Sequence, residues 1–150
     1  VDLTKIAEIK AFINRCRKLI KFFTKSSQKL ALLRQGLTNM KIKSEGLETW
    51  CPTRWGSLYN TTNSILVERP VFDWMLLKHP GSFTDIEIFN LLHDDSFFIT
   101  CRQVRSIWKP IKICINALES GSASLADCFI YMIKLAIAIY HIPDSISFKP

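Results

Sequence analysis

Apolar side chains separated by three and four residues recur along almost the whole sequence, and this spacing restricts the fold more than any other feature. An α-helix turns by about 100° per residue, so such side chains share one face of a helix. In the first helix this stripe consists of Ile6, Ile9, Ile13, Cys16, Ile20 and Phe23, with Phe12 and Leu19 at its edge. No segment sustains the alternation of a half-buried strand, and no internal repeat occurs. The sequence therefore predicts an all-α, irregular bundle of about six or seven helices, forming a single domain over residues 1–150.

Polar residues, glycines and prolines predict where the helices begin and end. The candidate caps at helix starts are Thr4, Ser26 or Ser27, Thr53, Asp95 or Ser96, and Ser122 or Ser124, and Thr84 with Glu87 has the form of a capping box. We expect Gly36 to end the second helix, Pro70 to separate the third from the fourth, and Pro110 to kink a long helix. The last helix is expected to stop at Pro143, before a tail that is either an edge strand or irregular.

The most apolar window covers residues 125–142. Asp127 and Lys134 interrupt it, and it falls short of the roughly 18 to 20 clean apolar residues that a membrane span needs. We therefore expect a buried helix here and no membrane partner.

The net charge of +7 is concentrated at the start of the chain. Residues 1–43 contain eleven Lys and Arg against two acids, a net +9, whereas the remaining residues contain nine against eleven, a net −2. In the first helix the side opposite the apolar stripe carries Lys10, Arg17, Lys18, Lys21 and Lys25. Such an asymmetry suggests a polyanion on one side of the molecule, with a merely solvated basic face as the alternative.

Residues that could support catalysis or metal binding are few. The five cysteines, of which none forms a Cys-x-x-Cys pair, are expected to be free, buried thiols in a reducing compartment. Asp94 and Asp95 follow His93 and could hold a divalent cation, but we expect them to cap the next helix instead. A glycine-rich phosphate loop and a Gly-x-Ser-x-Gly elbow are both missing. The sequence predicts that the chain is not an enzyme and takes no small-molecule substrate.

Residues 48–60, with the sequence ETWCPTRWGSLYN, contain two of the four tryptophans. Trp55 stands directly beside Arg54 at the expected start of a helix. Trp55 could pack into the core while Arg54 pairs with a carboxylate such as Glu48. Alternatively, an aromatic ring beside a guanidinium could contact a nucleic acid. The other tryptophans are expected to lie in the core.

The order of these segments resembles the central part of hAT-type transposases and their domesticated or decayed relatives. The resemblance rests on LIKFFTKSSQKLALLRQ (residues 19–35), PTRWGSLYNTTNSIL (residues 52–66), Trp108, and SLADCFIYMIKL (residues 124–135). It covers nearly the whole chain, and the Thr-Arg-Trp motif followed by Ser57 and Tyr59 is its most specific part. Gly56 departs from the pattern, because many relatives have asparagine there.

The resemblance implies that the chain is a helical insertion in an RNase H-like catalytic core. Trp55 is then expected to stack on a flipped base, with Arg54 as its phosphate or carboxylate partner and Ser57 as a further contact with the DNA. The catalytic Asp, Asp and Glu residues, and any Mg²⁺ that they bind, are expected outside this fragment, which begins at Val1 without an initiator methionine. The expected partner is DNA and the expected location is the nucleus, with no cofactor in the fragment itself. The alternative is a non-catalytic scaffold that binds another protein or its own copy through the helix at residues 125–142.

Overall fold

The computed structural model describes residues 7–143, and all regular structure in that range is helical. This confirms the prediction of an all-α bundle of about six helices. The elements are α1 (Ala7–Thr24), α2 (Ser27–Asn39), α3 (Ser57–Lys78), the short 3-10 helix η2 (Pro80–Ser82), α4 (Ile86–Leu92), α5 (Asp95–Leu118) and α6 (Leu125–Tyr140). The proposed cap at Thr4 and the tail at residues 144–150 lie outside the described residues.

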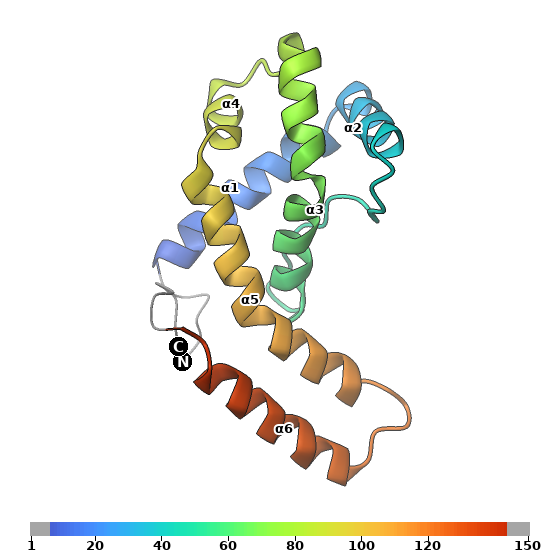
Figure 1. The fold of residues 1–150 in the computed structure, drawn as a ribbon, viewed down its shortest axis with the longest axis vertical. Helices are drawn as coiled ribbons and strands as arrows, with labels where there is room; N and C mark the ends of the chain where they lie inside the picture. The colour runs from blue at the N-terminus through green and yellow to red at the C-terminus, as the bar shows by residue number, and fades with distance from the viewer. Residues whose placement is uncertain (1–6, 144–150) are drawn as a thin grey trace.

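Helix α3 is the centre of the bundle. It packs against α1, α2, α5 and η2, and its buried residues lie on most of its circumference. Helix α1 crosses behind α3 and α5, whereas α6 lies along α5 at the lower edge of the molecule (Figure 1). Packing on several sides explains why α3 shows almost no separation of apolar and polar faces.

Packed aromatic rings join several helices within a largely aliphatic core. Phe23 of α1 stacks on Phe72 of α3, with ring centroids 5.0 Å apart, and meets Phe83 edge to face. A second group joins Phe12 of α1 to Phe97 at the start of α5. All the described members of the predicted α1 stripe are buried, so the three-and-four spacing located this face correctly.

The second helix continues past Gly36 to Asn39, so the prediction that Gly36 ends it is wrong. Gly36 is buried where α2 crosses α3, and a Cβ atom there would lie 2.4 Å from Cγ1 of Val71 and 3.0 Å from Trp74. The glycine is therefore used for close helix–helix approach and not as a helix stop.

Pro70 lies inside α3, so the expected break between two helices does not occur. A proline within a helix costs about 3 kcal/mol. Burial of Ile65, Phe72 and Met75 on either side of it contributes about 1.5–3 kcal/mol each, which outweighs that cost. Pro110 is also inside a continuous helix, α5, whose axis changes direction along its length as expected (Figure 1).

Some of the predicted helix caps are confirmed and others are wrong. Ser26 caps α2, and Ser124 caps α6 in a full capping box with Asp127. Helix α4 is capped by Asp85, whose carboxylate accepts the Glu87 amide at 2.9 Å, so the capping box proposed at Thr84 is wrong. The final helix ends at Tyr140, three residues before Pro143.

The five cysteines are free, and Cys16, Cys101 and Cys114 are buried as expected, whereas Cys51 and Cys128 are half-buried. Burial raises the pKa of the Cys16 thiol well above its usual value, with the neighbouring Cys101 adding to the effect. The Cys16 thiol is therefore neutral, and both side chains are apolar parts of the core.

Glu68 is a buried carboxylate on α3. Its Oε1 accepts a hydrogen bond from Oγ of Ser44 at 2.5 Å, whereas Oε2 has no hydrogen-bond partner within the part of the chain that the structure describes. Burial raises the pKa of this carboxyl group, against the opposing effect of Ser44. The charged form is therefore disfavoured in the folded protein.

Glu68→Gln is expected to stabilise the protein at pH 7. Because the folded-state pKa is raised, Glu68 lowers the free energy of unfolding as pH rises above the unfolded value of about 4.3. Chemical denaturation from pH 4 to pH 8 should show a gain of about 1 kcal/mol at pH 7 that shrinks toward pH 4. The exposed Glu45→Gln is the matched control and should change little. A less stable Glu68→Gln variant at pH 7 would show that the carboxylate is favoured where it lies.

Candidate nucleic-acid interface

The turn at residues 51–56 links the irregular connector to the start of α3. The prediction that Thr53 caps a helix beginning near Arg54 is wrong, because α3 begins at Ser57 after Gly56. Hydrogen bonds of the Ser57 hydroxyl hold the backbone of this turn instead. The hydroxyl accepts the Cys51 amide at 3.0 Å, and its oxygen lies 2.9 Å from the Cys51 carbonyl and 2.7 Å from the Arg54 carbonyl.

Ser57 is buried, so its hydroxyl holds the turn in shape and does not reach solvent. The prediction that Ser57 itself contacts DNA does not fit this position. Its role is to fix the backbone on both sides of Arg54 and thereby to aim the neighbouring side chains.

Trp55 projects from this turn with 79% of its surface exposed. The alternative in which Trp55 packs into the core is therefore wrong. The other three tryptophans behave as expected, since Trp108 is buried and Trp50 and Trp74 pack against the core. Of the four tryptophans, Trp55 alone is exposed. Packing of the core gives no reason for a large aromatic ring on this surface.

Arg54 is exposed beside Trp55. The Glu48 carboxylate, suggested as its partner, instead accepts a hydrogen bond from Nδ2 of Asn60 at 2.9 Å. Arg54 forms no ion pair with any residue in the range 7–143. Its guanidinium is available to an external anion.

Lys112 of α5 adds a second cation to the turn. A Cβ atom built on Gly56 would lie 2.6 Å from Cδ of Lys112 and 3.0 Å from its Nζ, so the lysine side chain runs directly over this glycine. Sequence reasoning missed Lys112, because no local pattern relates α5 to the turn. With glycine at position 56, the lysine side chain lies against the turn without moving aside.

The turn is electropositive at short range. The Thr53 hydroxyl, 3.2 Å from Sγ of Cys51, lowers the pKa of that thiol, and Arg54 contributes in the same direction. The start of α3 adds the positive end of a helix dipole. Arg54, Lys112 and the helix start therefore favour an anion next to the Trp55 ring.

The basic residues of α1 do not all gather into one site. Arg17 lies over the Trp50 ring, 4.8 Å from its centroid, on the connector that leads to the turn. Lys18 pairs with Glu87 of α4 at 2.6 Å, and this contact raises the lysine pKa. Lys21 and Lys25 line the same hollow of about 380 Å³ as Lys18 and Glu87, and Lys10 is exposed nearer the start of α1.

Asp94 is the N-cap of α5, as one interpretation of the adjacent aspartates predicted, whereas the cap proposed at Asp95 or Ser96 is wrong. Asp95 is the first residue of the helix and pairs with Arg69 at 2.7 Å, and His93 ends α4. Asp94 accepts the Ser96 amide at 3.0 Å and also pairs with Arg15. The Ser96 hydroxyl and Arg15 hold the pKa of Asp94 at about 2. Among residues 7–143 no group of three His, Cys, Asp or Glu side chains is arranged to hold a metal ion.

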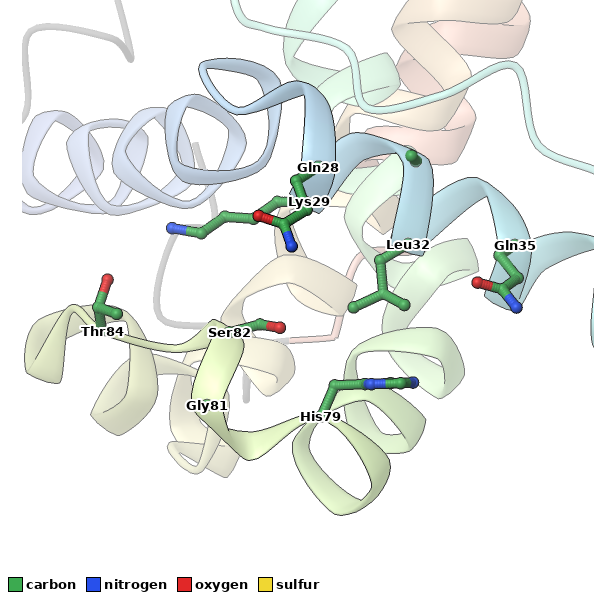
Figure 2. A pocket seen from close by; sticks show the side chains of 9 residues that line it. Gln28, Lys29, Leu32, Gln35, His79, Gly81, Ser82 and Thr84 are labelled. Carbon is green, nitrogen blue, oxygen red and sulfur yellow. The ribbon is translucent and has the colours of Figure 1, made fainter.

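A separate hollow of about 460 Å³ lies between α2 and the segment around η2 (Figure 2). Leu32 and Gln35 of α2 line one side, and His79 and Ser82 line the other. Gln35, His79 and Ser82 can form hydrogen bonds, but the lining includes no carboxylate and no thiol. The hollow is open and shares no lining residue with the turn at residues 51–56.

Comparisons of the chain with protein-family models, with curated proteins and with solved structures found no match. None of the helices between residues 7 and 143 combines the length and apolar character needed to cross a membrane.

Proposed function

We propose that the chain is a DNA-contacting helical domain whose turn at residues 51–56 holds an unpaired or flipped base. The observation that carries this proposal is the exposure of Trp55, at 79% of its surface, on a turn that hydrogen bonds keep rigid. Stacking of a base on an aromatic ring contributes roughly 1–3 kcal/mol, and every base offers a face for it.

The cations beside the ring support binding to a phosphate backbone. Arg54 belongs to the turn itself, and Lys112 reaches Gly56 of the turn from α5. In this proposal both groups contact the phosphates next to the base that stacks on Trp55. Lys10, Lys21 and Lys25 on α1 are additional phosphate contacts in this proposal, and Arg17 supports Trp50 behind the turn.

The wider proposal follows the resemblance to hAT-type transposases. The chain is then a non-catalytic insertion domain that positions DNA for an RNase H-like core, in the nucleus. Mg²⁺ and the acidic catalytic residues belong to parts of such a protein outside these 150 residues, and no cofactor is assigned to this chain.

Trp55→Ala is expected to weaken binding to a hairpin or a mismatched duplex by roughly 5- to 100-fold, because one base loses its stacking surface. Affinity for a fully paired duplex should change less than about twofold. Fluorescence anisotropy at several salt concentrations measures both, and the affinity for each should fall steeply with salt. Trp55→Phe should keep much of the preference, since it retains an aromatic face.

Leu77→Ala is the matched control, because Leu77 is an apolar side chain of α3 that is 82% exposed and lies at the opposite end of the helix. It should leave both affinities unchanged. Equal losses by Trp55→Ala on paired and unpaired substrates would reject base stacking. Binding that is weak at low salt and indifferent to Trp55 would reject DNA as the partner of this turn.

A further inference from the structure

The side of α6 turned away from α5 is apolar and exposed. Its residues expose between 45% and 82% of their surface and include Phe129, Ile130, Met132, Ile133, Ile137 and Tyr140. Helix α6 has no buried residue, so the expectation of a buried helix at residues 125–142 is wrong. Figure 1 shows why: α6 lies at the edge of the molecule, with α5 along one side only.

These side chains form one continuous face. At about 100° per residue they occupy less than half of the helix circumference, together with Ala126 and Ala136. Ala126, Ile130, Ile133, Ile137 and Tyr140 recur at intervals of three and four, which is the pattern of a helix–helix seam. Asp127 and Lys134, the charged residues of the helix, stand at one border of this face. Nothing within residues 7–143 covers it.

We propose that this face pairs with the same face of a second copy of the chain, in an antiparallel arrangement with two-fold symmetry. The α5–α6 hairpins of the two copies then form a four-helix interface. An isologous contact suits this surface, because a face without charges meets its own copy without repulsion. The α6 helix of each copy covers the apolar face of the other copy's α6, which α5 leaves exposed.

The exposed area approaches that of a standard protein–protein interface. An aromatic side chain buries on the order of 150–250 Å² and an aliphatic one less, so the six residues together offer no more than roughly 700 Å² per copy. Standard protein–protein interfaces bury about 800 Å² per partner. Leu125, which is 88% exposed at the start of α6, extends the same surface.

The border charges favour the antiparallel orientation. Asp127 and Lys134 are seven residues apart, two helical turns, and so lie on the same edge of α6. When two copies of the helix run in opposite directions with residues 130 and 131 at the two-fold axis, Asp127 of each copy comes opposite Lys134 of the other. The two helices then overlap over residues 125–136, and Ile137 and Tyr140 lie beyond the end of the partner's α6 helix. A parallel pair does not bring these charges together.

Sedimentation equilibrium of the chain from about 1 to 100 µM tests the proposal. The expected result is a reversible monomer–dimer equilibrium, with the mass rising from 17.3 kDa toward twice that value. Ile133→Glu places a charge at the middle of the seam and is expected to raise the dissociation constant at least about 100-fold. Lys134→Glu, which puts like charges opposite each other, is expected to raise it less.

Ile86→Glu is the matched control, because it makes the same change at an exposed isoleucine of α4 outside the proposed interface. It should leave the dissociation constant within about twofold, and circular dichroism should show that both variants remain helical. A chain that stays monomeric at about 100 µM, or a dimer that Ile133→Glu leaves intact, would overturn the proposal. So would a monomer that instead sediments with phosphatidylcholine vesicles through this face.

Discussion

Phe23→Ala is expected to lower the free energy of unfolding by about 3–5 kcal/mol. Phe23 is fully buried, stacks on Phe72 with ring centroids 5.0 Å apart, and contacts Phe22 and Phe83 edge to face. Truncation leaves a cavity among large, rigid rings that cannot collapse into it. Domains of this size are typically stable by about 5–15 kcal/mol, so the loss is a large fraction of the total.

Urea or guanidinium denaturation, followed by far-ultraviolet circular dichroism, measures this loss. Phe89→Ala on α4 is the matched control, because the same truncation there removes a ring that is 36% exposed. The control should cost about 1 kcal/mol or less. Similar losses for the two variants would mean that Phe23 does not form the centre of the core.

Gly36→Ala is expected to destabilise the protein by about 1–3 kcal/mol, although alanine is the better helix former by about 1 kcal/mol. The added methyl group would lie 2.4 Å from Cγ1 of Val71, a buried and β-branched side chain that has little freedom to move. Helices α2 and α3 must therefore separate, and the Trp74 ring, at 3.0 Å, must move as well.

The same denaturation measurement tests this substitution, with Gly121→Ala as its control. Gly121 lies in the loop between α5 and α6 and has no atom within 4 Å of the position that a Cβ would take. The control should change stability by less than about 0.5 kcal/mol. A stabilising Gly36→Ala would show that helix propensity outweighs packing at the α2–α3 crossing.

The candidate site was partly visible in the sequence. The pairing of Arg54 with Trp55 drew attention to the turn, because a large ring beside a cation at a helix start is unusual in a small chain. Whether Trp55 was packed or exposed could not be decided, since both alternatives fit the same amphipathic spacing. No pattern in the sequence indicated Lys112, because its position over Gly56 depends on how α5 packs against α3.

Local sequence determined the features that depend on residues a few positions apart. The helical class and the buried stripe of α1 follow from spacing along one helix. The caps at Ser26, Asp94 and Ser124 follow from side-chain oxygens that reach their own backbone two or three residues later.

Tertiary structure alone decided the features that depend on segments distant in the sequence. Gly36 continues a helix because α3 crosses it there, and Pro70 stays inside α3 because the burial of its neighbours outweighs the lost hydrogen bond. Trp55 and the outer face of α6 remain in solvent because no other described element covers them. Apolar character drives a side chain out of water, but only the arrangement of the helices determines which apolar side chains find a partner within the chain.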